Sequence, residues 1–195
     1  MNKIEFFFRW LHVIAGVTWI GHLYFFNFVN VPLQAALDDS TKPNVNPKLM
    51  PRALWWFRWG AMVTFLSGLL LFALNYAYVP GMGFGWPGLK APTTWIMMGM
   101  TFGVIMWFNV WFIIWPINKG IALKTITGDA VAAKRRTAYL ASRTNTYLSG
   151  PMLFGMLGAG HGGAGGATSI VYALVIGLAA MFVAIFHSTK VGKSF

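Results

Sequence analysis

The stretch SIVYALVIGLAAMFVAIFH, residues 169–187, decides the fold class of this chain. It is apolar along its length and contains no Lys, Arg, Asp or Glu. A helix of about 20 apolar residues spans the hydrocarbon core of a bilayer. The stretch therefore predicts a membrane-spanning helix at residues 169–188 and an integral membrane protein.

Four more apolar segments precede it, at residues 6–31, 54–78, 93–115 and 143–160. The first is too long and too aromatic for a signal-peptide core, and no small-residue cleavage site follows it. The fourth is short as an apolar run, but Asp129 is expected to cap a helix that begins near Ala130 and lengthens it. We expect one all-α membrane domain over residues 1–195, an integral bundle of about five transmembrane helices.

Proline and glycine mark the expected ends of these helices. Pro116 is expected to close the third segment, and residues 79–92 and 160–166 form glycine-rich connections. The prolines expected to break the loop after the first segment are Pro43, Pro47 and Pro51. A GxxxG pair within the third segment, Gly99 and Gly103, predicts close approach of a neighbouring helix.

The overall composition supports a membrane chain and excludes several other classes. Hydrophobic residues make up 57% of the sequence and charged residues 10%, against about 25% charged in soluble domains. A soluble enzyme and a disordered chain are therefore excluded. The chain has no Cys, which excludes disulfides, iron–sulfur clusters and c-type haem attachment. A redox centre would have to be held by His or Met.

The basic residues predict the orientation in the membrane. Twelve of the 15 Lys and Arg residues fall in regions on one side of a five-helix chain: Lys42, Lys48, Arg52, Arg58, Lys119, Lys124, Lys134, Arg135, Arg136, Arg143, Lys190 and Lys193. The positive-inside rule therefore places the N-terminus outside and the C-terminus in the cytoplasm. Topology accounts for the net charge of +11, and no nucleic-acid partner is expected because the interleaved basic and aromatic pattern is missing.

Four histidines are the candidate ligands of a metal or cofactor, because an ionisable group inside a bilayer is a functional hypothesis by default. His12 and His22 lie within the first segment, about 15 Å apart along a helix, so they cannot bind one metal together. His161 is expected at the outer end of the fourth segment and His187 at the inner end of the fifth. The depths suggest an outer pair, His12 with His161, and an inner pair, His22 with His187, each able to hold haem b.

Other polar residues within the segments offer fewer routes to catalysis. Glu5 is the one acidic residue in an expected span, and it lies at the very start, which argues against catalysis by paired carboxylates. No Ser/His/Asp set and no phosphate-binding loop is found. The polar residues expected either to bond across helices or to line a substrate or quinone pocket are Asn109, Asn145, Tyr147 and Ser149.

Several motifs occur in an order that is shared with one family. They are residues 10–21 (WLHVIAGVTWIG), 54–59 (LWWFRW) followed by 64–68 (TFLSG), 109–116 (NVWFIIWP), 142–151 (SRTNTYLSGP) continuing to Met156 and His161, and finally His187. Together they cover most of the chain. They resemble the membrane domain of the bacterial membrane-bound urate oxidase (urate hydroxylase) family.

The resemblance implies a membrane oxidoreductase module, with His12, His161 and His187 as candidate haem or active-site residues. The chain departs from the family pattern in three respects. Members usually carry a C-terminal cytochrome c domain, whereas this chain stops at Phe195 without a Cys. Their membrane region is longer between the second and third motifs, and His22 stands where a small residue is expected. The resemblance therefore neither extends to His22 nor establishes urate as the substrate.

The leading hypothesis is a multi-pass protein of the bacterial inner membrane that binds haem b through His12, His161, His187 and His22. It would pass electrons between a quinone or small substrate and a separate carrier, such as an external cytochrome c. One alternative is a non-catalytic subunit of a larger respiratory or photosynthetic complex. Further alternatives are urate oxidation by this chain alone and transport of copper or a small solute. If the chain is an enzyme, we expect a membrane oxidoreductase.

Overall fold

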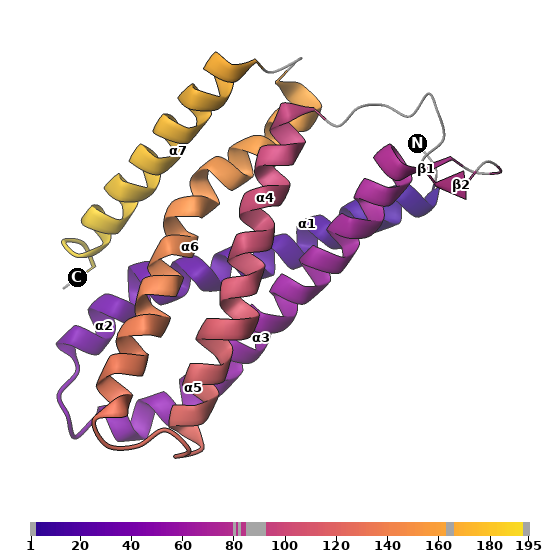
Figure 1. Cartoon of the computed structure of the whole chain (residues 1–195). Coiled ribbons are helices and arrows are strands. Elements are labelled where there is room, and N and C mark those ends of the chain that lie inside the picture. The colour runs from indigo at the N-terminus through magenta and orange to yellow at the C-terminus, as the bar shows by residue number, and fades with distance from the viewer. Residues whose placement is uncertain (1–2, 80, 82, 85–92, 163–165, 193–195) are drawn as a thin grey trace.

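The computed structural model describes residues 3–79, 81, 83–84, 93–162 and 166–192, which form a bundle of long helices (Figure 1). The α-helices are α1 (Lys3–Tyr24), α2 (Val31–Ala36), α3 (Lys42–Phe72), α4 (Thr94–Phe108), α5 (Trp115–Ala122), α6 (Ala130–His161) and α7 (Ala167–Ser188). Three π-helical segments adjoin them: η1 (Phe25–Asn30), η2 (Ala73–Ala77) and η3 (Asn109–Ile114). A short antiparallel ladder pairs β1 (Tyr78–Val79) with β2 (Gly83–Phe84). The predicted all-α fold class is confirmed.

The helices extend beyond the apolar segments that predicted them. α1, η1 and α2 form one continuous helix over Lys3–Ala36, and α3 with η2 forms another over Lys42–Ala77. α4, η3 and α5 run without a break over Thr94–Ala122, so the prediction that Pro116 ends this helix was wrong. Pro116 instead occupies the first turn of α5. The π-helical turns of η3 directly precede Pro116. In a π-helix each backbone hydrogen bond joins residues five positions apart, one more than in an α-helix.

The prolines expected to break the first loop also lie within a helix. Pro43 is in the first turn of α3, and Pro47 and Pro51 follow inside it. A spacing of four residues puts all three on one face, so the N–H groups missing at Pro47 and Pro51 fall opposite the carbonyls of Pro43 and Pro47. All three residues are exposed. The carbonyls left without a helix partner therefore lie on the outer face, where water or lipid head groups can reach them.

Four of the helices in the described part of the chain are long and apolar enough to cross a membrane. They are Lys3–Ala36, Lys42–Ala77, Thr94–Ala122 and Ala167–Ser188. α6 is the fifth long helix, and it begins at Ala130 as expected, although the Asp129 side chain makes no capping hydrogen bond. It does not meet the apolar criterion because its first half is polar and carries four basic residues, Lys134, Arg135, Arg136 and Arg143.

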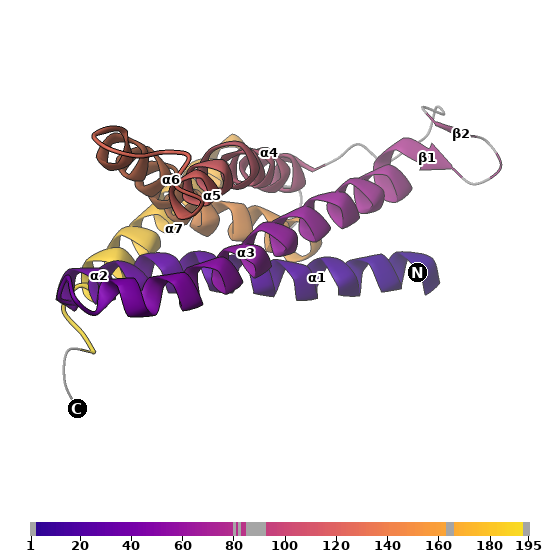
Figure 2. The same ribbon diagram turned by 90° about the horizontal axis from the view of Figure 1, so that it is seen from below.

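The helices pack as two antiparallel pairs, α1 with α3 and α4 with α6, and α7 packs along α6. Figure 2 shows α1 and α3 on one side of the molecule and α4 with α6 on the other. Glycines allow the close crossings. A methyl group on Gly60 would lie 3.0 Å from the backbone N of Trp19, and one on Gly155 would lie 2.8 Å from the N of Gly99. Gly99 therefore makes the predicted close contact, whereas a methyl group on Gly103 would meet nothing within 4 Å.

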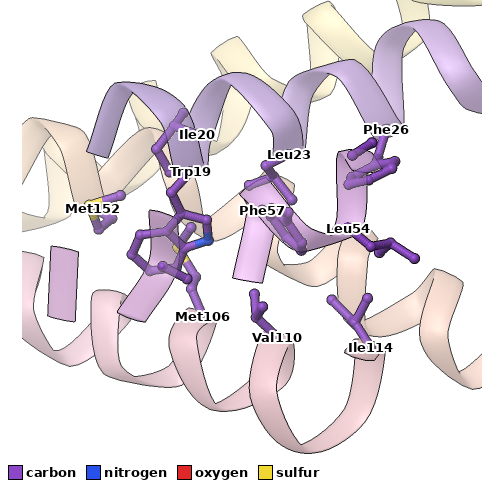
Figure 3. Packing of buried hydrophobic residues seen from close by; sticks show 12 residues of the cluster. Trp19, Ile20, Leu23, Phe26, Leu54, Phe57, Met106, Val110, Ile114 and Met152 are labelled. Atoms are coloured by element: carbon purple, nitrogen blue, oxygen red, sulfur yellow. The ribbon is translucent and has the colours of Figure 1, made fainter. Parts of the chain in front are cut away.

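One apolar core joins the two pairs (Figure 3). Leu23 of α1, Phe57 of α3 and Met106 of α4 are almost completely buried, and Val110 of η3 and Met152 of α6 close the cluster. Phe57 also packs edge-on against Phe26 with ring centroids 5.4 Å apart. The expected glycine-rich connection at residues 79–92 falls largely outside the described residues, as do Lys90 and Lys193. The connection expected at 160–166 begins later than predicted, because α6 continues to His161, and residues 163–165 lie outside the described residues.

Candidate functional site

His12 lies partly buried on α1 against α3, and its ring meets a serine there. The Nδ1 atom is 3.2 Å from Ser67 Oγ. The Ser67 hydroxyl lies 2.6 Å from the carbonyl oxygen of Val63, to which it donates. Because that hydroxyl proton is already engaged, Oγ accepts from His12, and the proton of the neutral ring is on Nδ1. The Nε2 lone pair of His12 is then free to bind a ligand.

Gly68 makes room for the His12 ring. A methyl group on Gly68 would lie 3.0 Å from Cε1 of His12 and 3.3 Å from its Nδ1. Any larger residue at this position would push the ring away from α3. The Thr64-Phe-Leu-Ser-Gly68 run of the sequence thus provides both the acceptor for His12 and the space that it occupies.

His22 repeats this arrangement about three turns further along α1. Its Nδ1 lies 2.7 Å from the carbonyl oxygen of Thr18, which can only accept, so Nδ1 carries the proton. The Nε2 lone pair is therefore free here too. The side chain lines an open groove of about 530 Å³ between α1 and α3, together with Arg52 and Trp56.

The other two histidines lie at the ends of helices. His161 is the last residue of α6 and His187 is in the last turn of α7, and both are exposed. No hydrogen bond joins any two of the four histidines in the described part of the chain. The structure therefore brings His12 and His22 against α3 separately, and the pairings of His12 with His161 and His22 with His187 remain predictions.

A polar seam runs along the buried face of α6 and consists of Ser142, Asn145, Thr146 and Ser149. Asn145 donates from Nδ2 to the carbonyl oxygen of Met106 over 2.9 Å. Its Oδ1 accepts from Nδ2 of Asn109 over 2.7 Å. Ser149 Oγ lies 3.0 Å from the hydroxyl of Tyr24 on α1. The prediction that Asn109, Asn145 and Ser149 bond across helices is confirmed.

Two π-helical segments supply partners to the polar seam, and sequence reasoning missed them. Asn27 of η1 donates from Nδ2 to Ser142 Oγ over 2.9 Å and to the carbonyl oxygen of Leu23 over 3.0 Å. Asn109 begins η3. An asparagine side chain that takes the carbonyl one turn earlier competes with the helix ladder, which favours the wider π turn. The signal in the sequence is an asparagine within an apolar run, as at Asn27 and Asn109.

Arg58 forms a second feature that sequence analysis did not single out. Its guanidinium carbon lies 3.9 Å from the ring centre of Trp115, 4.8 Å from that of Trp111 and 5.2 Å from that of Trp59. The guanidinium makes no ion pair with any described residue. Three ring faces therefore stabilise this charge in place of a carboxylate. The tryptophan-rich run 54–59 around a basic residue was the available signal.

The described carboxylates lie away from the helix interior. Glu5 pairs with Arg9 over 2.6 Å at the start of α1, and Asp39 pairs with Lys42 over 2.9 Å in the turn before α3. Asp38 accepts from the hydroxyl of Ser40 over 2.7 Å in the same turn. The interior chemistry is therefore that of imidazoles, amides and hydroxyls, which can ligate a metal or orient a ligand but supply no carboxylate base.

These features define a class: an all-α protein with membrane-suited helices that hold two partly buried histidines, His12 and His22, and a seam of amides and hydroxyls. The family can also be stated. The chain belongs to the family described as urate oxidase N-terminal, which matches residues 37–84 and 88–193. The urate-oxidase relationship expected from the motifs is thereby confirmed. No curated protein and no solved structure matches the chain.

The matched region divides the candidate histidines. His161 and His187 fall within it, whereas His12 and His22 precede residue 37. The polar seam of α6 and Arg58 are inside the match as well. The family match assigns no role to any of the four histidines, and His12 and His22 rest on their geometry in α1.

Proposed function

We propose that this chain is an integral-membrane redox module of the urate oxidase family that binds haem b, which Nε2 of His12 would hold. The observation that carries the proposal is the Nδ1 hydrogen bond of His12. A histidine that ligates a metal usually donates its other ring N–H to a neighbouring acceptor. Ser67 provides that acceptor at 3.2 Å.

The residues around His12 fit such a role. Ser67 holds the ring in one tautomer, and Gly68 leaves space for it beside α3. Arg9, one turn earlier on α1, places a cation on the same helix for a propionate, although it is paired with Glu5 here. When bound, haem b would supply one-electron transfer. The protein's own part is to orient the imidazole and to keep carboxylates away from it.

We propose a bacterial inner-membrane location with several membrane crossings, the N-terminus outside and the C-terminus in the cytoplasm. The basic residues of the loop at 123–129 and of the start of α6 support this orientation. His161, His187 and His22 remain the candidate further ligands. An external cytochrome c is the proposed electron partner of this haem b module.

A reduced-minus-oxidised optical spectrum of the purified protein tests the proposal, with a pyridine haemochrome to count haems. We expect a b-type signal that His12→Ala abolishes or halves, according to whether one or two haems are bound. Thr101→Ala, a change at an exposed hydroxyl that bonds only to its own helix, is the matched control and should keep the full signal. Folded wild-type protein without a haem signal would contradict the proposal.

The family match favours a second candidate function, urate oxidation by this chain. It predicts that membranes containing the chain consume urate, and that consumption is lost with His161→Ala or His187→Ala, both within the matched region. Haem in a chain that leaves urate untouched would support the electron-transfer module alone. Co-purification with a fixed set of partners would favour the accessory-subunit alternative.

A further inference from the structure

The groove between α1 and α3 is separate from the position of His12. It has a volume of about 530 Å³, and its lining includes Val17, Gly21, His22, Phe25, Arg52 and Trp56. Val17 is 67% exposed and Trp56 is 56% exposed, so the groove opens on the outer surface of the helix pair. Both helices are apolar enough to cross a membrane. A ligand would therefore enter this groove from the surrounding lipid.

His22 gives the groove a hydrogen-bond acceptor. Its Nδ1–H is directed back to the carbonyl oxygen of Thr18 on its own helix, 2.7 Å away. The opposite edge of the ring, with the Nε2 lone pair, has no hydrogen-bond partner among the described residues. A ligand that pairs with this nitrogen must donate a hydrogen bond to it or accept its electron pair, as a metal ion does.

Arg52 gives the same groove a set of donors. One guanidinium nitrogen donates to the carbonyl oxygen of Lys48 over 2.5 Å, and no ion pair to a described carboxylate is formed. The remaining N–H groups are available to an oxygen acceptor. Arg52 and His22 therefore offer complementary contacts, donors from the first and an acceptor from the second, within one groove.

The remaining walls are apolar and partly aromatic. Phe25 and Trp56 provide ring faces, and Gly21 leaves open space where a side chain would otherwise stand. Trp55 and Trp59 lie beside Trp56 and are exposed, which is typical of the interfacial belt of a membrane protein. The polar contacts of the groove thus lie near one surface of the bilayer, while its apolar walls extend along the helices.

We propose that this groove binds the head group of a membrane quinol. A quinol is a flat ring with an apolar tail, and each of its two hydroxyl groups can both donate and accept. One hydroxyl donates to Nε2 of His22, the other accepts from Arg52, and the ring packs against Phe25 and Trp56. A phosphate group would satisfy Arg52 but would leave Nε2 of His22 without a donor.

This inference names the membrane-side partner of the proposed redox module and in that sense rests on the proposed function. Its evidence is independent, because it comes from residues that do not touch His12. Binding of a quinol to the groove is also measurable without haem. The failure of one proposal can therefore be distinguished from the failure of the other.

The test is equilibrium binding of decylubiquinol to the full chain in phosphatidylcholine nanodiscs under reducing conditions. We expect His22→Phe and Arg52→Gln each to weaken binding about three- to tenfold, the effect of one hydrogen bond. Trp56→Leu should weaken binding as well. Lys48→Gln and Trp10→Leu are the matched controls, because they change an equivalent exposed side chain outside the groove, and both should bind as wild type does.

His22→Gln separates a contact from a structural effect, because its amide oxygen still accepts a hydrogen bond. It should restore part of the affinity that His22→Phe loses. Equal affinity in wild type, His22→Phe and Trp56→Leu would overturn the proposal. Displacement of decylubiquinol by phosphatidylglycerol at equal affinity would show a phospholipid site instead, and loss of a haem spectrum in His22→Phe would show a haem site.

Discussion

At the scale of single residues, the partner of each side chain decides its chemistry. His12 and His22 each have Nδ1 engaged, one by a serine of another helix and one by a carbonyl of its own helix. Asn109 Nδ2 donates to Oδ1 of Asn145, whose own Nδ2 donates to the carbonyl oxygen of Met106. Interior polar groups are thus held in defined orientations by neighbours, which is the condition for a preorganised binding site.

The amide pair can be tested by a double-mutant cycle. Asn145→Ala leaves Asn109 Nδ2 without its acceptor and removes one of the two donors to the carbonyl oxygen of Met106, so we expect a loss of about 2 kcal/mol of stability. The coupling energy with Asn109→Ala should be about 1 kcal/mol, the range found for hydrogen bonds within membranes. Thermal unfolding in detergent gives both values. Additive effects of the two changes would contradict a direct bond.

At the scale of elements, continuity of the helices is the main result. Asparagines within apolar runs are associated with π turns at η1, η2 and η3, and prolines spaced by four are tolerated on one exposed face of α3. Asn75 in η2 donates to the carbonyl oxygen of Leu71, as Asn27 in η1 does to that of Leu23. Asn109, the first residue of η3, instead donates to Oδ1 of Asn145 on α6.

The crossing of α4 and α6 depends on one glycine of α6. A methyl group at Gly155 would lie 2.7 Å from the carbonyl oxygen of Trp95 and 2.8 Å from the N of Gly99, both backbone atoms. Gly155→Ala should therefore destabilise the protein by about 1–3 kcal/mol in thermal unfolding. Gly103→Ala is the control, since a methyl group there meets nothing within 4 Å. Similar losses in the two variants would refute this account of the crossing.

The turn before α3 predicts a pH dependence. Hydrogen bonds from the hydroxyl of Ser40, and next from Thr41, lower the pKa of Asp38 to about 2. The unfolded value is about 3.9, so the stabilisation of the turn is complete above that pH and is lost as the pH falls through 2. The Thr41 amide resonance should shift with a midpoint near pH 2. Asp38→Asn should abolish that shift, and a midpoint near 4 would contradict the geometry.

At the scale of the whole molecule, the distribution of basic residues and the length of the apolar helices favour one orientation in the membrane. The described basic residues concentrate at the start of α3, around α5 and at the start of α6, whereas the helices that follow are apolar. The ends of α4 and α6 that carry Trp95 and His161 are nearly free of charge. The proposed orientation, with the basic ends in the cytoplasm, follows from this asymmetry.

Single-cysteine labelling tests the orientation without background, because the chain has no Cys. Thr127→Cys lies in the basic loop and Thr168→Cys in the first turn of α7, and both positions are exposed. In intact cells, a membrane-impermeant maleimide should label Thr168→Cys alone. In inverted vesicles, it should label Thr127→Cys alone. The reverse pattern would invert the proposed topology, and labelling of both from one side would exclude a crossing between them.

Several properties could be read from the sequence because they depend on local composition. The apolar run at 169–187 predicts a membrane-suited helix from its length, and the absence of Cys and of interior carboxylates restricts the chemistry to His, amides and hydroxyls. The motif at 142–151 indicated the family and contained the polar seam of α6. None of these conclusions requires knowing which helices touch.

The tertiary structure decided the contacts between residues far apart in the chain. His12 meets Ser67 across 55 positions, and Tyr24 meets Ser149 across 125. No local pattern specifies such partners, because they depend on the helix crossings that glycines such as Gly60 and Gly155 allow. The position of the prolines inside α3 and the groove at His22 likewise depend on packing. Packing determines whether a carbonyl without a helix partner, or a ring nitrogen without a hydrogen bond, is exposed.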